Sequence, residues 1–213
     1  MTPRAAPLTT ERRLWAEGVT RIAGVDEVGR GSLAGPVIAA AVILPPGERV
    51  RGACDSKRLT AKQREEIAVE IRAKALAVSI AAATAREIER WNIRRATILA
   101  IRRALRRLPV EPERVLVDGL PLPDLVPHTA IVGGDRRCHT IACASIVAKV
   151  FRDRLMRLLH PRYPEYGWET NVGYATGEHR TACDVYGLTP HHRRTFFPAQ
   201  LELELELEAL GTH

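Results

Sequence analysis

Adjacent carboxylates interrupt an apolar stretch near the start of the chain. Residues 22–44 read IAGVDEVGRGSLAGPVIAAAVIL, so Asp26 and Glu27 stand between two runs of valine, isoleucine and alanine. The apolar runs predict two buried strands, and the glycine-rich centre predicts the connection between them. One interpretation makes the acids ordinary turn residues beside glycines that only permit positive φ. The other places the acids at the end of a core strand, where they can bind a cation.

Two further acids occupy the same kind of position. Asp118 follows the apolar run 115–117 and precedes a glycine, and Asp135 follows the apolar run 130–132 and two glycines. Ligands gather at the ends of strands in open α/β sheets. If these strands share one sheet, four carboxylates converge at one edge. Clustered carboxylates raise one another's pKa values unless cations neutralise them.

The chemistry of this acid set favours hard divalent cations. Oxygen ligands without cysteine or histidine suit Mg²⁺ or Mn²⁺, which also bind phosphate groups. A net charge of +7 assists binding to a polyanion. The carboxylate set and the positive net charge together indicate metal-assisted hydrolysis of a nucleic-acid phosphodiester, with one ion activating water and another stabilising the leaving oxygen. Because neighbouring strand residues point to opposite faces, we expect the strand to bend or end at Glu27, so that Asp26 and Glu27 reach the same ions.

The elements that must position these acids follow from hydrophobic periodicity. Residues 77–84 form a short apolar run that predicts another strand. Thr60 and Gln63 fit the capping box of a helix, and Ile67 and Ile71 supply its apolar face. These elements fit the open α/β sheet whose strand ends would gather the acids.

Two longer helices are expected further along the chain. The first is expected over residues 85–108 as an amphipathic helix. Its expected buried face comprises Ile88, Trp91, Ile98, Ile101 and Leu105. The second is expected over residues 141–160, where Ser145, Lys149 and Asp153 recur every four residues and therefore share one face.

The two ends of the chain carry weaker signals. Residues 1–19 lack an apolar signal core and are expected to form a flexible N-terminal arm. Residues 201–213 begin LELELELE, whose alternation is a strand signal, but a glutamate at every second position favours a frayed helix or a disordered, charged tail without assigned function. No apolar run approaches the roughly 18 residues needed to cross a bilayer. The protein is expected to be cytoplasmic, without membrane contact.

Seven short motifs occur in a fixed order between about residue 21 and residue 198. They are DEVGRGSLAGPV, DSKRL, VDG, GD, ASIVAKVFRDRLM, GYATGEH and HHRRTF. Each is weakly specific alone, but the ordered set resembles ribonuclease HII, the type 2 branch of the RNase H family. The resemblance implies an RNase H-like fold, with a five-stranded mixed sheet flanked by helices. It places the catalytic core at residues 20–160 and a small helical, substrate-contacting region at residues 161–200.

The resemblance also assigns roles by position. The family's catalytic, metal-binding acids correspond to Asp26, Glu27, Asp118 and Asp135. The residues that face the ribonucleotide and the RNA-to-DNA junction correspond to Gly29, Arg30, Gly31 and Tyr174. Asp153 matches a family position that we interpret as structural or as supporting a neighbouring site residue. The chain departs from the family pattern at Val172, where a basic residue is common, and at Thr195, where serine is common.

The implied reaction needs Mn²⁺ or Mg²⁺ and a mixed nucleic-acid substrate. Ribonuclease HII hydrolyses RNA paired with DNA and nicks duplex DNA 5′ to an embedded ribonucleotide, leaving a 3′-hydroxyl and a 5′-phosphate. Only the 2′-hydroxyl distinguishes such a nucleotide, and a bare glycine backbone can approach it closely. Lys57, Lys149 and Ser145 are expected to hold phosphates. The protein is expected to act as a monomer.

The remaining cysteines, histidines and arginines are expected to be structural or peripheral. Cysteines 54, 138, 143 and 183 form no C-x-x-C pair and no zinc-like spacing with histidine, which favours reduced thiols. His179, His191 and His192 fit no standard zinc spacing, so surface or phosphate contacts are expected. Arg193 and Arg194 are expected to contact the DNA backbone.

Two alternative functions remain open from the sequence. The first is another RNase H-like nuclease, such as a junction resolvase or a transposase-type enzyme, which would cut an all-DNA duplex comparably. The second is a basic nucleic-acid-binding module, which would bind without turnover. Carboxylates that repel phosphate argue against the second.

Overall fold

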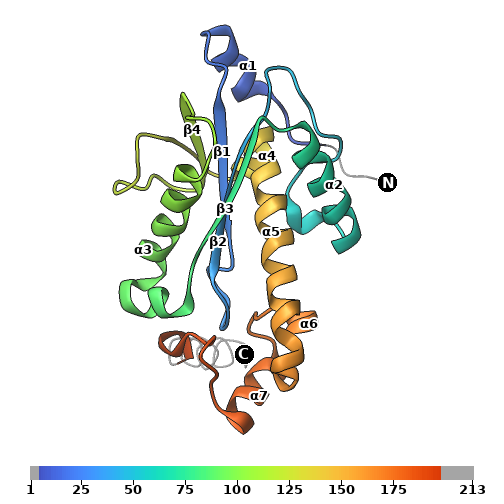
Figure 1. Cartoon of the computed structure of the whole chain (residues 1–213), viewed down its shortest axis with the longest axis vertical. Helices are drawn as coiled ribbons and strands as arrows, with labels where there is room; N and C mark the ends of the chain where they lie inside the picture. Colours follow the sequence, from blue (N-terminus) through green and yellow to red (C-terminus); the bar gives the residue numbers. More distant parts are fainter. Residues whose placement is uncertain (1–4, 198–213) are drawn as a thin grey trace, which may run out of the picture.

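A five-stranded mixed sheet forms the centre of the computed structural model, which describes residues 5–197 (Figure 1). The strand order across the sheet is β3-β2-β1-β4-β5. β1 pairs antiparallel with β2 and parallel with β4, while β2 pairs antiparallel with β3 and β4 pairs parallel with β5. The strands are β1 Ile22–Val28, β2 Val37–Ile43, β3 Ala77–Ala83, β4 Arg114–Asp118 and β5 Thr129–Ile131. The predicted mixed sheet is confirmed.

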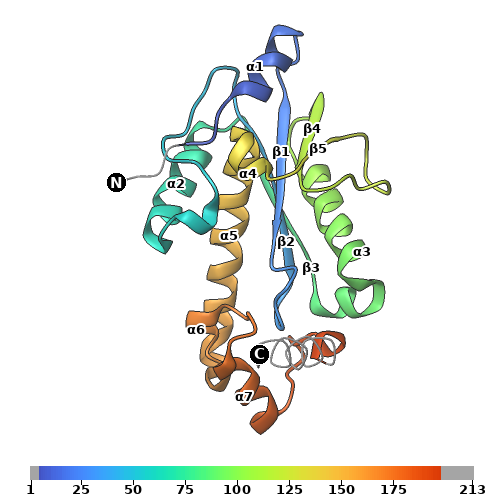
Figure 2. The same cartoon turned by 180° about the vertical axis from the view of Figure 1, so that it is seen from behind.

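Helices cover both faces of this sheet (Figures 1 and 2). Every residue of β2 is buried, because its alternate side chains face α3 on one side and α2 with α5 on the other. The helices of the described chain are α1 Thr9–Ala16, α2 Ala61–Lys74, α3 Ala85–Arg106, α4 Gly134–Arg137, α5 His139–Leu159, α6 Trp168–Asn171 and α7 Gly177–Tyr186. Short 3₁₀ turns are η1 Ser56–Arg58, η2 His160–Arg162, η3 Pro164–Tyr166 and η4 Arg194–Phe196.

The start of α5 packs directly against the centre of β1. A Cβ added to Gly24 would lie 2.2 Å from the carbonyl carbon of Thr140, so only glycine fits at this strand position. α5 buries most of its length, which fixes its polar strip relative to the ends of β1. The predicted helix over residues 141–160 is confirmed, and it begins two residues earlier.

The long helix α3 differs from its prediction at its first turns. Asn92 has φ 64 and ψ 166, a non-helical conformation that interrupts the helix. The buried face is therefore not continuous across the break, since the 3.6-residue period holds only within an uninterrupted helix. Ile88, Ile98 and Ile101 are buried as expected, but Trp91 is 44% exposed. The expectation that Trp91 is buried was wrong.

The N-terminal segment also differs from its prediction as a flexible arm. Residues 9–16 form α1, and the buried Glu11 accepts hydrogen bonds through Oε1 from the backbone N–H of Thr140 (2.8 Å) and from its hydroxyl (3.1 Å). The first N–H groups of a helix lack partners within it, and a carboxylate satisfies them well. The segment is thus attached to the start of α5, and Leu8 and Leu14 are buried beside it.

The C-terminal helices form a small cluster below the sheet in Figure 1. Trp168 is fully buried, and its ring stacks on Tyr166 with centroids 5.5 Å apart. The cluster packs against the end of α5 through Met156. The predicted tail, residues 201–213, lies outside the described residues. Within residues 5–197, no helix combines the length and apolar character that crossing a membrane requires.

Candidate active site

A pocket of about 540 Å³ lies where β1 and β4 end. These strands run in parallel, so their carboxyl ends meet at the same end of the sheet. Every site residue expected from the sequence lines this pocket, and Val28 and Ser56 line it as well. The expected residues are Asp26, Glu27, Gly29, Arg30, Gly31, Lys57, Asp118, Asp135, Ser145, Lys149 and Tyr174. The fold thus brings them together, while their individual roles remain predictions.

The strand β1 does not bend or end at Glu27, contrary to the expectation. Its pairing with β2 continues through Glu27↔Ala39 and Val28↔Ile38. Asp26 pairs with Ala40 and so faces α5, whereas Glu27 faces α3. The pairing of β1 with β4, however, stops at Val25↔Val117. Both acids line one pocket because the β4 side of β1 is open beyond that pair, where the longer glutamate side chain can reach around the strand.

Asp118 and Asp135 are held by a tight glycine connection. The backbone N–H of Gly134 donates to Asp118 Oδ1 at 2.6 Å. A Cβ on Gly134 would lie 2.7 Å from Ile141 Cδ1 and 3.2 Å from that carboxylate oxygen. Asp135 follows in the short helix α4 and not at the strand end itself. The glycine therefore allows the close approach of α4 to β4 that joins these two acids.

Burial and neighbouring carboxylates destabilise the charged forms of Asp26, Glu27 and Asp135. Burial, followed by the charges of Glu27 and Asp118, raises the pKa of Asp26 well above its ordinary value. Burial also raises the pKa of Glu27, although Arg30 opposes this with an ion pair of 3.2 Å. Burial and the charges of Asp55 and Asp118 raise the pKa of Asp135. Such a group of carboxylates favours bound positive charge.

The donor set fits hard divalent cations. The pocket offers carboxylate oxygens from two strands and from α4, and its lining contains no cysteine or histidine. Oxygen ligands of this kind suit Mg²⁺ and Mn²⁺ and disfavour softer metals. Asp26, Glu27, Asp118 and Asp135 are the residues that would hold the ions.

Two fully buried arginines hold the glycine loop that borders the acids. Arg193 donates to the carbonyl oxygens of Gly29 (2.6 Å), Arg30 (2.8 Å) and Gly35 (2.9 and 3.0 Å). Its predicted contact with the DNA backbone is wrong, because its side chain is 0% exposed. A charge this deep is retained because several carbonyl oxygens accept its N–H groups.

Arg152 is the second of these arginines, and sequence reasoning missed it. It donates to the carbonyl oxygens of Pro36, Ala34 and Val172 at 2.9 to 3.2 Å. Its Nε lies 2.1 Å from where a Cβ on Gly29 would stand, so Arg152 takes up the space that Gly29 leaves. The available signal was its position seven residues after Ser145, on the same face of α5. A Cβ on Gly31, by contrast, meets no atom within 4 Å, so Gly31 leaves the backbone accessible.

Tyr174 closes the pocket from the C-terminal region. The ammonium of Lys149 and the guanidinium of Arg152 each lie 5.2 Å from its ring centroid. Lys149 also donates to Asp153 Oδ1 at 2.8 Å, and Asp153 pairs with Arg64 at 3.6 Å. Asp153 thus orients Lys149 and does not line the pocket, as its structural interpretation expected.

The histidines form a buried cluster, contrary to the expected surface position. His179 and His192 are 0% and 2% exposed, and their Nε2 atoms lie 3.0 Å apart. Cys183 Sγ lies 3.2 Å from His192 Nε2, so the fold joins a cysteine to the two histidines although their sequence spacing is not that of a zinc site. Each ring nitrogen has a partner within the protein, including Trp168, the Tyr174 carbonyl and Thr189. We interpret the cluster as a hydrogen-bonded part of the packing core. His191, the neighbouring residue, is half-buried.

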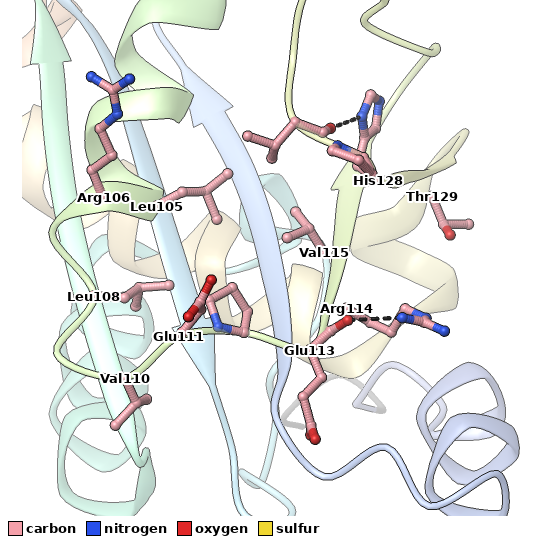
Figure 3. Close-up of a pocket in the computed structure, with 13 residues that line it drawn as sticks. Leu105, Arg106, Leu108, Val110, Glu111, Glu113, Arg114, Val115, His128 and Thr129 are labelled. Atoms are coloured by element: carbon pink, nitrogen blue, oxygen red, sulfur yellow. Dashed lines mark hydrogen bonds between the residues drawn. The ribbon is translucent and has the colours of Figure 1, made fainter.

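A second cavity shows that size alone does not mark the site. Figure 3 shows this cavity of about 790 Å³, bounded by the end of α3 and the starts of β4 and β5. The carboxylate of Glu113 there accepts hydrogen bonds from the backbone N–H groups of Thr20 (2.9 Å) and Arg21 (2.8 Å). Leucines and valines form much of the remaining lining. Asp26, Glu27 and Asp135, whose pKa values are raised by burial and by neighbouring carboxylates, lie instead in the smaller pocket.

The fold and the carboxylate pocket define a class of protein, a nuclease with an RNase H-like fold. Residues 23–198 match the family described as ribonuclease HII. The chain belongs to the ribonuclease HII family and is a metal-dependent endoribonuclease of the ribonuclease H type 2 class.

The four cysteines are free and buried, as expected for structural thiols.

Individual relatives agree with this assignment. The ribonuclease HII of Thermosynechococcus vestitus is 52% identical over 208 residues, and the match covers 94% of each chain. The ribonuclease H2 of Pyrococcus horikoshii OT3 superposes with a TM-score of 0.70 at 28% identity, covering 82% of this chain and 93% of that one. The PCNA:RNase HII complex structure from Archaeoglobus fulgidus matches with a TM-score of 0.68 at 26% identity, covering 81% and 93%.

Proposed function

We propose that the protein hydrolyses RNA in RNA/DNA hybrids and nicks duplex DNA 5′ to an embedded ribonucleotide, leaving a 3′-hydroxyl and a 5′-phosphate. One observation carries the proposal: the four acids and the Gly-Arg-Gly loop line a single pocket. A pair of Mg²⁺ or Mn²⁺ ions, when bound, supplies an activated water and stabilises the leaving oxygen. Asp26, Glu27, Asp118 and Asp135 are proposed to hold those ions.

The cationic side chains of the pocket are proposed to position the phosphate. Lys57 and Lys149 lie in the lining, and Asp153 orients the Lys149 ammonium at 2.8 Å. Ser145 is buried and its hydroxyl lies 3.1 Å from that of Ser56, which restrains both groups. Positioned donors of this kind place the scissile bond against the acids without reading the base.

Recognition of the ribonucleotide is proposed to lie in the glycine loop and Tyr174. The open space at Gly31 admits a 2′-hydroxyl to the backbone, and Arg193 holds the preceding peptide groups in place. Tyr174 can stack on the neighbouring sugar and disfavour a further 2′-hydroxyl there. The two elements together select a junction between ribonucleotide and deoxyribonucleotide, with residues 161–197 supplying part of the substrate-contacting surface.

The test is cleavage of a DNA duplex that carries one ribonucleotide, compared with its all-DNA twin. The protein should nick only the first, on the 5′ side of the ribonucleotide, and only with Mg²⁺ or Mn²⁺ present. Comparable cutting of the all-DNA twin would favour a resolvase-like nuclease. Tight, salt-sensitive binding without any cutting would favour a binding module. Full cutting in excess chelator would overturn the assignment of the ions.

We further propose that the protein works as a monomer in the cytoplasm. The four cysteines are free and buried, which suits a reducing compartment. Light scattering of the purified protein should give the mass of one chain, 23.6 kDa, and a dimer mass would contradict the proposal.

A further inference from the structure

A groove on α3 combines arginines with an exposed tryptophan, and the proposed reaction does not use it. The groove has a volume of about 610 Å³ and is lined by Arg86, Arg90, Arg95 and Trp91, with Ile98 and Leu99 as apolar floor. Trp91 is 44% exposed, and the Arg90 guanidinium lies 5.2 Å from its ring centroid. The break in α3 at Asn92 leaves Trp91 exposed in this groove.

The positive charge of the groove is not neutralised from within. Two carboxylates, Glu87 and Asp124, line it beside five arginines, and the Glu87 carboxylate pairs with one of these, Arg103, at 2.7 Å. Within residues 5–197, no carboxylate forms an ion pair with Arg86, Arg90 or Arg95. A groove with unneutralised arginines around an apolar floor fits a ligand that is both acidic and apolar.

The chain itself leads to this groove. The backbone N–H of Arg194 donates to Glu89 Oε1 at 2.8 Å, and Phe196 packs among the apolar residues of α3. Glu89 is the residue before Arg90, so η4 contacts α3 next to the groove, and the last described residue, Phe197, packs in the adjoining C-terminal cluster. Leu201 follows Phe197 by four residues, a span of about 13 Å when extended. A segment tethered this closely has a high effective concentration at the groove.

The sequence that follows has the required chemistry. Residues 201–208 read LELELELE, four leucines alternating with four glutamates. We propose that this C-terminal segment docks in the α3 groove, with its glutamates against Arg86, Arg90 and Arg95 and its leucines against Trp91 and the apolar floor. Docking would hold η4 against α3 and so support Arg193, which anchors the glycine loop.

The experiment measures acrylamide quenching of Trp91 in the full chain. The contribution of Trp91 is obtained by difference from the Trp91→Phe variant. Substituting Glu202, Glu204, Glu206 and Glu208 together by lysine should raise the quenching constant of Trp91 by about twofold, because a docked segment excludes small solutes from the residues beneath it. High salt should raise the constant of the unmodified chain in the same direction.

Charge reversal in the groove provides the matched rescue. The double substitution Arg90→Glu and Arg95→Glu should expose Trp91 to quencher in the protein whose tail is unmodified. In the protein whose tail carries the four lysines, the same double substitution should protect Trp91 again. Arg12→Glu with Arg13→Glu, two exposed positions on α1, should leave the quenching unchanged.

Two outcomes would overturn the proposal. One is equal quenching of Trp91 in the unmodified chain and in the lysine-substituted chain. The other is protection of Trp91 only by added single-stranded DNA, whatever the tail carries, which would identify the groove as a nucleic-acid site. Neither readout depends on cleavage, so they are independent of the proposed reaction.

Discussion

Asp26 is a buried acid of the pocket whose charged form is destabilised by its surroundings. Its pKa is raised by burial and by Glu27 and Asp118, so its ionised form costs folding free energy when no cation is bound. We expect Asp26→Asn to abolish cleavage and yet to raise the unfolding free energy in chelator by about 1 kcal/mol. Thermal unfolding in chelator and in Mn²⁺ measures this. Asp184→Asn, at an exposed position, is the control; a destabilised Asp26→Asn protein in chelator would contradict the charge argument.

Arg193 acts on the site through the backbone carbonyls that it holds. Lysine at this position is one point charge and cannot reach the oxygens of Gly29, Arg30 and Gly35 together. Arg193→Lys should lower the unfolding free energy by about 3 kcal/mol and reduce kcat/KM on the one-ribonucleotide duplex. Its neighbour Arg194 is exposed, so Arg194→Lys should change neither quantity substantially. Equal effects of the two variants would show that burial at 193 does not matter.

At the scale of elements, the contact between β1 and α5 sets the position of Asp26 relative to Ser145 and Lys149. Gly24→Ala would place a methyl group 2.2 Å from the Thr140 carbonyl carbon, so α5 must shift or the protein must unfold. We expect a loss of about 3 kcal/mol or more in unfolding free energy, measured by urea denaturation. Gly177→Ala, at the start of α7 with no atom within 4 Å, should be neutral or stabilising. A neutral Gly24→Ala would disprove the packing constraint.

One carboxylate on α1 makes hydrogen bonds to the start of α5, beside the apolar packing of Leu14 with Ile141. Glu11 Oε1 is the acceptor for both the backbone N–H and the hydroxyl of Thr140. Glu11→Ala leaves these buried donors without an acceptor and should cost about 1–3 kcal/mol of unfolding free energy. Glu17→Ala, at an exposed residue just beyond α1, serves as the control and should cost little. If both variants are equally stable, the hydrogen bonds of Glu11 contribute nothing to the stability of this contact.

At the scale of the whole molecule, the C-terminal region and the sheet are joined where His192 lies. Ala34 and His192 form a β-bridge, and Arg193 N–H donates to the Leu33 carbonyl at 2.8 Å. Burial, with the charges of His179 and His191, lowers the pKa of His192 to about 3. The unfolded chain therefore binds a proton that the folded chain excludes between about pH 6.5 and about pH 3.

Stability should fall as the pH falls through that window, by up to about 1.4 kcal/mol per pH unit for this group. His192→Gln should flatten the decline between pH 6.5 and the onset of general acid unfolding, at some cost in stability at neutral pH. Thermal unfolding of both proteins from pH 7 to pH 4 measures the slopes. Parallel slopes would show that His192 is not the group responsible.

The sequence alone predicted the five strands, the helices α2, α3 and α5, and most of the residues that line the pocket. Apolar runs located the strands, one capping box located the start of α2, and residue spacing located α3 and α5, because these signals depend on near neighbours in the chain. The acids could be placed together because each follows an apolar strand that ends at glycine, and parallel strands end on the same side. The ordered motifs supplied the family, and the matching relatives confirm it.

Only the tertiary structure decided which of these side chains are buried and what they hold. Arg193 lies 163 residues from Arg30, whose carbonyl it binds, and Glu11 lies 129 residues from Thr140. Periodicity carries no information about partners that distant. The sequence therefore predicted Arg193 as a DNA-contacting charge and residues 1–19 as a flexible arm. Glu27 lines the pocket without any break in β1, because β4 pairing ends at Val25 and leaves that edge open. The sequence thus determined which groups are present, and the packing of distant segments determined which of them are free to bind a ligand.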